Sequence, residues 1–245
     1  MKQLSLVSLA LLLTFSSRAQ STEFTRVLIP IATETLPGAH GSLWASELWL
    51  HADSDTGAVI LPLSIADLNP FRHVTVRLPI FRAPAGRAPG QILFVSTNAL
   101  PDLTFNLRIR DLSRQAETWG TEIPVVTEDE FRTTRLTLLP VPLGGAFRAM
   151  VRIYGLEPAG GAVRVRVTTI DASANSSVLY DATVALNRTG SQYLPPYAEL
   201  PLQVLVPGDG SVRVDVESLT PGLSFWAFAS VTHNETQHVT VISPN

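Results

Sequence analysis

The chain has 245 residues, of which 45% are hydrophobic and 16% are charged, and its formal net charge is −3. This apolar content is typical of a globular protein, and the acidic balance argues against the concentrated basic face of nucleic-acid binders. The chain contains no cysteine, which excludes disulfide bonds, cysteine catalysis and a lipid-modified N-terminal cysteine.

The first 19 residues predict an export signal. Lys2 supplies a positive charge, residues 4–15 are almost wholly apolar, and "SSRA" at 16–19 fits a signal peptidase site. We therefore expect cleavage near Ala19 and a location in the periplasm or outside the cell. Loss of Lys2 and Arg18 would leave 16 arginines against 21 acidic residues, a net charge of −5. No segment reaches the roughly 20 continuous apolar residues of a membrane helix, so no membrane span is expected.

Period-two alternation of apolar and polar residues predicts strands along the rest of the chain. Turn signals such as Pro37-Gly38 and Asn69-Pro70 separate these strands, and no segment predicts a helix longer than one turn. In the first half the predicted strands are 26–33, 43–52, 59–65, 73–80, 91–97, 104–111 and 121–127.

Residues 36–57, "LPGAHGSLWASELWLHADSDTG", combine histidines, tryptophans and a D-x-D-x-G run. Asp53 and Asp55 resemble part of a calcium loop, but the acidic residue that would close such a loop is missing. A polar hairpin turn is therefore the favoured interpretation, with calcium as the alternative. His40 and His51 would lie near opposite ends of a strand, on the order of 30 Å apart, so they cannot share an ion.

The two tryptophans of this stretch are five residues apart, so they face opposite sides of the predicted strand. We expect Trp44, Leu48 and Leu50 in the core and Trp49 on the outer face or at an interface. An exposed Trp49 could stack on a sugar ring or a protein partner, which makes it a candidate binding residue.

Glu128, Asp129 and Glu130 form a second acidic group, at the predicted junction between the two halves of the chain. A calcium ion there would need oxygen ligands from several segments. A solvated turn is therefore favoured, and a metal site is the alternative.

The second half shows the clearest alternation, in "AVRVRVTT" and "SVRVDVES". We expect Arg164 and Arg166 to form surface pairs with Asp215 and Glu217 across neighbouring strands. The predicted strands are 135–141, 147–155, 162–169, 178–186, 200–206, 211–218 and 224–232.

The chain also repeats itself. Residues 92–113 align with 212–233 at an offset of 120, and two upstream segments, 26–32 and 43–50, resemble 136–142 and 146–153. Three matches in the same order predict two copies of one unit, each the size of an immunoglobulin-like sandwich. The predicted fold is all-β, with two tandem immunoglobulin-like β-sandwich domains of antiparallel sheets at 20–130 and 131–245.

No catalytic motif is recognisable: G-x-S-x-G, H-E-x-x-H, P-loop and G-x-G-x-x-G sequences do not occur. We therefore predict a non-enzymatic protein with no catalytic residues and no cofactor apart from the calcium alternative. An enzyme of unrecognised type stays open, because residues distant in sequence can meet in space.

Three segments carry a family resemblance. They are "LIPIATETLPGAHGSLWASELWLHADSD", the stretch from "QILFV" to "TWGTEIPVV", and the closing "SFWAFASVTHNETQHVTVISPN". They resemble secreted, mostly uncharacterised bacterial tandem β-sandwich proteins, common in Acidobacteriota-like genomes, with an "IPV…GxxGSxWxTxLWLxN" start and a "YASVxDNxTGDPxYIP" end. This resemblance implies export and tandem sandwiches but no activity. The group also has a mid-chain "TFGQxIP"; in the matching "TWGTEIP" of this chain Thr121 stands in place of the Gln, and the closing segment lacks the Gly-Asp-Pro turn of the group.

A second similarity is to periplasmic pilus chaperones, through "TRVLIP" at 25–30 and "LPIFRAPAGRAPGQILFV" at 78–95. It implies binding of subunits by strand addition, with Arg26 anchoring a subunit's C-terminus. Such chaperones also use a lysine, and no lysine follows Lys2.

Together these observations predict an exported, non-enzymatic module for binding, adhesion or structure in the cell envelope or outside the cell. Its partner would be a protein or a glycan, and not a nucleic acid. The alternatives are a pilus-chaperone-like protein, a carbohydrate-binding accessory protein and an enzyme of unrecognised type.

Overall fold

The computed structural model of the protein describes residues 23–55, 57–63, 65, 68–82, 89–114, 119–170, 176–206 and 208–244. The predicted export signal at 1–19 lies outside these described residues. Among the helices within them, none has the length and apolar character needed to cross a membrane.

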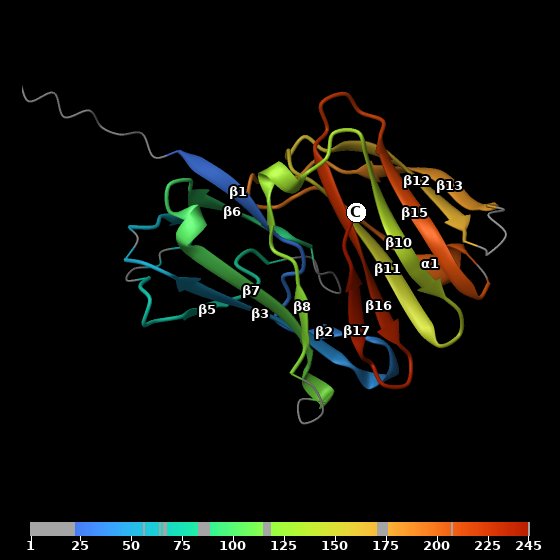
Figure 1. The fold of residues 1–245 in the computed structure, drawn as a ribbon, viewed down its shortest axis with the longest axis horizontal. Coiled ribbons are helices and arrows are strands. Elements are labelled where there is room, and N and C mark those ends of the chain that lie inside the picture. Colours follow the sequence, from blue (N-terminus) through green and yellow to red (C-terminus); the bar gives the residue numbers. More distant parts are fainter. Residues whose placement is uncertain are drawn as a thin grey trace, which may run out of the picture.

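The described residues are almost entirely strands and connecting turns, as the alternation predicted (Figure 1). The first nine strands are β1 (Phe24–Ile29), β2 (Leu36–Pro37), β3 (Leu43–Ala52), β4 (Ile60–Leu61), β5 (Val74–Arg77), β6 (Gln91–Ser96), β7 (Leu103–Asp111), β8 (Thr121–Ile123) and β9 (Val126–Thr127). The others are β10 (Arg135–Leu143), β11 (Phe147–Gly155), β12 (Gly161–Thr169), β13 (Val178–Leu186), β14 (Tyr197–Pro201), β15 (Gly210–Ser218), β16 (Phe225–His233) and β17 (Val239–Ile242). The helical elements are short: η1 (Ala39–Gly41), η2 (Leu100–Asp102), η3 (Leu112–Arg114), η4 (Glu128–Glu130) and α1 (Leu202–Leu205).

The strands form four antiparallel sheets. Sheet I has the order β4-β6-β1-β9, and sheet II has the order β2-β3-β7-β8 with β5 also paired to β3. Sheet III has the order β10-β15-β12-β13, and sheet IV has the order β14-β11-β16-β17. Sheets I and II make the first sandwich, and sheets III and IV make the second. The predicted all-β sandwich class is confirmed.

The strand order repeats between the two sandwiches. In sheet II, β5-β3-β7-β8 matches β14-β11-β16-β17 of sheet IV, and β1-β6-β4 of sheet I matches β10-β15-β12 of sheet III. The similar segments 92–113 and 212–233 therefore occupy the same places, β6-β7 in one sandwich and β15-β16 in the other.

The strand order also shows where the chain crosses between sheets. Strands β6 and β7 lie in different sheets of the first sandwich, and β15 and β16 lie in different sheets of the second. The last two strands of the second sandwich, β16 and β17, pair within sheet IV.

Several predicted strands are shorter than expected or broken: 26–33 ends at Ile29, 73–80 is reduced to Val74–Arg77, and three others change as follows. The predicted strand 200–206 is wrong in its second half, where α1 buries Leu202 and Val206 and leaves Val204 in solvent. A continued strand would have placed all three on one face. Pro62 and Pro124 lack the N–H that a ladder needs, so β4 stops at Leu61 and the predicted strand 121–127 divides into β8 and β9.

The two sandwiches are docked through sheet IV, which is buried on both faces. One face, with Val151, Phe225 and Ala227, belongs to the core of the second sandwich. The opposite face belongs to the core of the first sandwich, and its buried residues there are Tyr154, Leu156, Trp226 and Phe228. The first sandwich therefore completes its core with side chains from the second.

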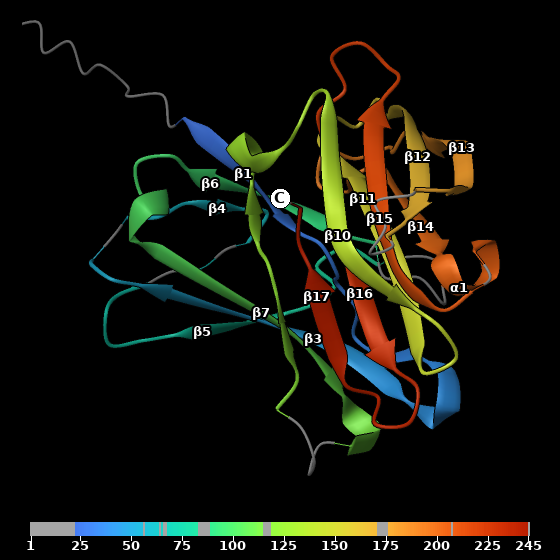
Figure 2. The ribbon, with the colours of Figure 1, turned by 45° about the vertical axis from the view of Figure 1, so that its right-hand side comes forward.

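Polar contacts reinforce this docking. The Tyr154 hydroxyl donates a hydrogen bond to the Pro30 carbonyl, and the Ile92 amide donates to the Tyr193 carbonyl at 2.9 Å. Strand β17 contacts β8 of the first sandwich, where the Thr121 hydroxyl donates to the Val239 carbonyl at 2.9 Å. Figure 2 shows β16 and β17 on the side of the second sandwich that faces β3 and β7.

Candidate functional site

Trp49 lies in the middle of β3 and points away from the core of the first sandwich. Its neighbours Leu48 and Leu50 are fully buried, whereas 36% of Trp49 is exposed, as the alternation predicted. Across the sheet it stands between Thr75 of β5 and Asn106 of β7. The indole is therefore fixed on the outer face of a sheet whose other face is packed core.

A histidine ring completes this aromatic surface. The rings of His73 and Trp49 are stacked, with centroids 5.5 Å apart and an angle of 19° between their planes. Two residues before His73, Phe71 is almost fully exposed at the tip of the Asn69–Arg72 turn, where the Phe71 amide donates to the Asn69 side-chain oxygen at 3.0 Å. Phe71 thus lies two residues along the chain from the ring that stacks on Trp49.

Charged and amide groups flank the indole on the same face. Glu47 accepts a hydrogen bond from Arg110 at 2.6 Å, and Arg108 donates to the Asn106 side-chain oxygen at 3.0 Å. These pairs hold the polar groups in place beside the aromatic rings. We call the surface made by Trp49, His73, Thr75, Asn106, Glu47 and Arg108 the Trp49 face.

The chemistry of the Trp49 face suits a ligand with one apolar side and a polar rim. An indole offers a large, rigid apolar surface. Amide, hydroxyl, carboxylate and guanidinium groups together both donate and accept hydrogen bonds. A sugar ring, which has a C–H face and hydroxyls at its edge, matches both features.

The metal candidates are dispersed in the structure. His40 lies in η1 and His51 near the end of β3, at opposite ends of the strand, and His51 has Asp53 at 3.6 Å. Asp53 and Asp55 lie in the bend that follows β3, as a polar turn predicts. Among the described residues, no three His, Asp or Glu side chains gather into a group that could hold a metal ion.

The acidic group Glu128, Asp129 and Glu130 forms η4 between the two sandwiches. Its side chains serve the turn itself, because the Glu130 carboxylate accepts from the Thr127 amide at 2.8 Å and Asp129 accepts from the Thr127 hydroxyl. Glu128 accepts a hydrogen bond from Arg26. The group is thus a capped turn, in line with the favoured interpretation.

Arg26 joins the two sandwiches. Its guanidinium donates to Glu128 at 2.7 Å and to Glu157 of the second sandwich at 2.6 Å. Burial by itself would lower the pKa of Arg26, but the hydrogen bonds to these carboxylates outweigh burial and raise it. Arg26 therefore forms ion pairs with two carboxylates of its own chain at the junction between the sandwiches.

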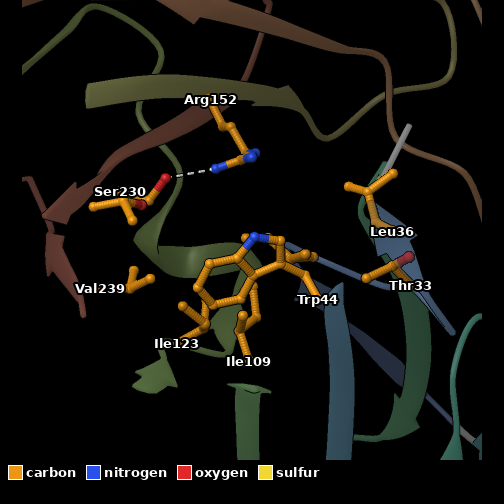
Figure 3. A pocket seen from close by; sticks show the side chains of 10 residues that line it. Thr33, Leu36, Trp44, Ile109, Ile123, Arg152, Ser230 and Val239 are labelled. Atoms are coloured by element: carbon orange, nitrogen blue, oxygen red, sulfur yellow. Dashed lines mark hydrogen bonds between the residues drawn. The ribbon is translucent and has the colours of Figure 1, made fainter. Parts of the chain in front are cut away.

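A cavity of about 100 Å³ lies at the same junction, between sheet IV and the first sandwich (Figure 3). Figure 3 shows the Arg152 side chain directed toward the Trp44 indole across this space. Trp44, expected in the core, is partly buried and forms part of the cavity wall. This cavity could not be predicted from the sequence, because its walls come from strands of both sandwiches.

The surface pairs expected on sheet III have different partners. Arg164 and Arg166 lie opposite Glu217 and Asp215, but both hydrogen-bond to Asp181 of β13, at 2.7 and 3.0 Å. Hydrogen bonds from Arg164 and then from Arg166 lower the pKa of Asp181 to about 2. The predicted pairing is wrong because a strand has neighbours on both sides, and a guanidinium can reach either.

Asp215 instead accepts from Arg213 and Arg135, at 2.9 and 2.6 Å, and from the Thr137 hydroxyl at 2.6 Å. Burial alone would raise the pKa of Asp215. The hydrogen bonds from Arg213, Thr137 and Arg135 outweigh burial and leave that pKa below its usual value. This carboxylate is the best-satisfied ionic group on the outer face of sheet III.

We expect the protein to lose stability as the pH falls below about 4, partly through Asp215. A carboxylate whose pKa is depressed by folding stabilises the protein above its unfolded pKa of about 3.9, and that contribution disappears as the pH falls through the folded pKa. Asp215→Asn should cost about 1–3 kcal/mol at pH 6 and less at pH 2.5. Urea unfolding at both pH values measures this, and Thr137→Val, which keeps the carboxylate, should retain most of the pH dependence. An equal cost for Asp215→Asn at both pH values would contradict the assignment.

Comparison of the chain with protein-family models, with curated proteins and with solved structures finds no significant match.

Proposed function

We propose that the protein is an exported, non-catalytic binding protein that holds a glycan on its Trp49 face. The observation that carries the proposal is the partly exposed Trp49, held on the outer face of sheet II, stacked by His73 and flanked by Thr75 and Asn106. Export rests on the predicted signal at residues 1–19.

The duplication supports a specialised role for this face. Trp49 of β3 aligns with Arg152 of β11, and both point away from the core of their own sandwich. In the second sandwich the equivalent face is covered by the first sandwich, and Arg152 is nearly buried there. Of these two related faces, the one with Trp49 is the one left open to a partner.

The Trp49 face is also favoured as a binding site because its side chains are held in place before a ligand binds. A site on packed strands holds its side chains more precisely than one on loops, and a ligand then has less to order when it binds. Leu48, Leu50 and Leu107 anchor β3 and β7 in the core directly beneath the Trp49 face.

The pilus-chaperone-like alternative is less favoured. It needs Arg26 to receive the terminal carboxylate of a pilus subunit. In the folded chain Arg26 already pairs with Glu128 and Glu157, and these pairs bridge the two sandwiches. The arginine thus has a structural role that accounts for its position.

We expect Trp49→Ala to weaken glycan binding at least tenfold, which corresponds to a loss of about 1.4 kcal/mol, because stacked aromatic side chains dominate such contacts. A glycan array would identify the ligand, and calorimetric titration would give the affinity. His73→Ala should also weaken binding, whereas Val204→Ser, at an exposed apolar position on α1 of the second sandwich, should not. Unchanged affinity in Trp49→Ala, or an array on which the wild-type protein binds no glycan, would refute the proposal.

A further inference from the structure

The cavity at the junction has two chemically distinct walls. Its apolar wall comes largely from the first sandwich and includes the Trp44 indole, Ile109 and Ile123. Its polar wall comes from sheet IV and includes Arg152, Ser230 and Thr232. In Figure 3 the guanidinium of Arg152 lies above the indole, with the isoleucines on the far side.

Hydrogen bonds hold Arg152 in position, but they use only part of its N–H donors. Its side chain is only 13% exposed, and it donates to Glu199 at 2.9 Å through Nε and to Ser230 at 2.7 Å through Nη1. These two bonds use two of the five N–H donors of a guanidinium. The group also lies over the Phe228 ring, with 5.9 Å between Cζ and the ring centre. Packing and hydrogen bonds therefore fix a cationic donor at the cavity.

Close packing also fixes the Trp44 indole. A Cβ atom added at Gly38 would overlap the indole Nε1 of Trp44 and the Ser42 hydroxyl. Any larger residue at position 38 would displace the indole. The glycine thus allows the loop before β3 to lie directly against the indole that forms the apolar wall.

The two walls and the volume define the ligand class. We propose that this cavity binds a short-chain monocarboxylate of two or three carbon atoms, with its carboxylate on Arg152 and the neighbouring hydroxyls and its alkyl group against Trp44. An apolar cavity of about 150 Å³ accommodates benzene, with six non-hydrogen atoms, so about 100 Å³ suits about four or five. An aromatic acid is too large.

The chain itself shows that one guanidinium can serve two carboxylates. Arg26 pairs at the same time with Glu128 and Glu157. Arg152 has one carboxylate partner, Glu199, and a neutral hydroxyl on its other bonded nitrogen. With a ligand carboxylate bound, Arg152 would pair with two carboxylates, as Arg26 does. Hydrogen bonds between a guanidinium and a carboxylate are stronger than hydrogen bonds between neutral groups.

This site is separate from the Trp49 face, because it lies between the sandwiches and shares no residue with that face. Its ligand would touch both sandwiches at once. Binding would therefore stabilise the docked arrangement by mass action, in proportion to the ligand concentration.

The test is titration of the full mature protein with sodium propionate, followed by calorimetry and by thermal and urea unfolding, with sodium chloride at equal ionic strength as the reference. With a dissociation constant of about 1 mM, 20 mM propionate should lower the unfolding equilibrium constant about twentyfold. Propionamide, which has the same shape without the charge, should have less than a third of this effect. No saturable binding up to 50 mM propionate, or equal effects of the acid and the amide, would overturn the proposal.

Variants locate the ligand. Val239→Phe should fill the cavity and abolish the propionate effect, and the double variant Arg152→Gln, Glu199→Gln should abolish it without leaving either charge unpaired. Trp49→Ala should bind propionate as the wild type does, so that failure of the glycan proposal and failure of this one are distinguishable. Undiminished propionate binding in folded Val239→Phe would place the ligand elsewhere and overturn the assignment.

Discussion

Phe228→Ala is expected to destabilise the protein by about 3–5 kcal/mol and to weaken both sandwiches, although Phe228 belongs by sequence to the second one alone. The side chain is fully buried and lies in the core cluster of the first sandwich. It stacks on Tyr154 and Trp226, with ring centres 6.4 and 5.4 Å apart. Removing it leaves a large void between the sandwiches and loses these ring contacts.

The measurement is urea unfolding followed by circular dichroism and by tryptophan fluorescence. Because the two sandwiches share a core, both signals should change together in one transition, for the wild type and for the variant alike. Phe71→Ala, at a position that is 98% exposed, is the matched control and should change the stability by less than about 0.5 kcal/mol. Two separate transitions in the wild type, or a loss below 1 kcal/mol in Phe228→Ala, would contradict the shared core.

This shared core also explains why part of the predicted strand 224–232 shows no alternation of apolar and polar residues. In "FWAFA", residues 225–229, all five side chains are buried, because sheet IV is covered on both faces. A run without alternation is typical of a strand buried on both sides. The sequence shows that the run is apolar, but only the three-dimensional arrangement shows that a second sandwich covers the other face.

Much of the local structure could be predicted. The alternation in 43–52, 147–155 and 178–186 gave the bounds of β3, β11 and β13, and it placed Trp49 outward between two buried leucines. Period two is a property of neighbouring residues in one strand, so it is visible in the sequence.

The composition of the Trp49 face could not be predicted in full. His73 lies beside Trp49 only because β5 pairs with β3, and Asn106 only because β7 pairs with it on the other side. Pairing depends on how the sheets assemble, and alternation within one strand does not specify the neighbouring strand. The same limit accounts for Arg164 and Arg166, whose partner Asp181 lies on β13, the other neighbour of β12.

The second large effect is expected at Gly160, in the turn between β11 and β12. Its φ is +71°, a left-handed conformation that costs residues with a Cβ about 1–2 kcal/mol. A Cβ there would also overlap the Leu186 carbonyl oxygen, which belongs to the backbone and cannot simply rotate away. Gly160→Ala must therefore both strain the turn and push β13 away from it, at a total cost of about 3 kcal/mol or more.

Two other glycines allow the cost of the strained φ to be measured apart from the cost of the steric overlap. Gly222 has a φ of +76° with nothing within 4 Å of an added Cβ, so Gly222→Ala should show the conformational cost alone, about 1–2 kcal/mol. Gly145 has neither a positive φ nor a close neighbour, and Gly145→Ala should stay within about 0.5 kcal/mol of the wild type. Urea unfolding of the three variants side by side should rank them in this order, since Gly160 alone among these three glycines combines the strained φ with a backbone atom in the way. If Gly160→Ala cost no more than Gly222→Ala, the turn would have room to move, and the close approach to Leu186 would not limit this position.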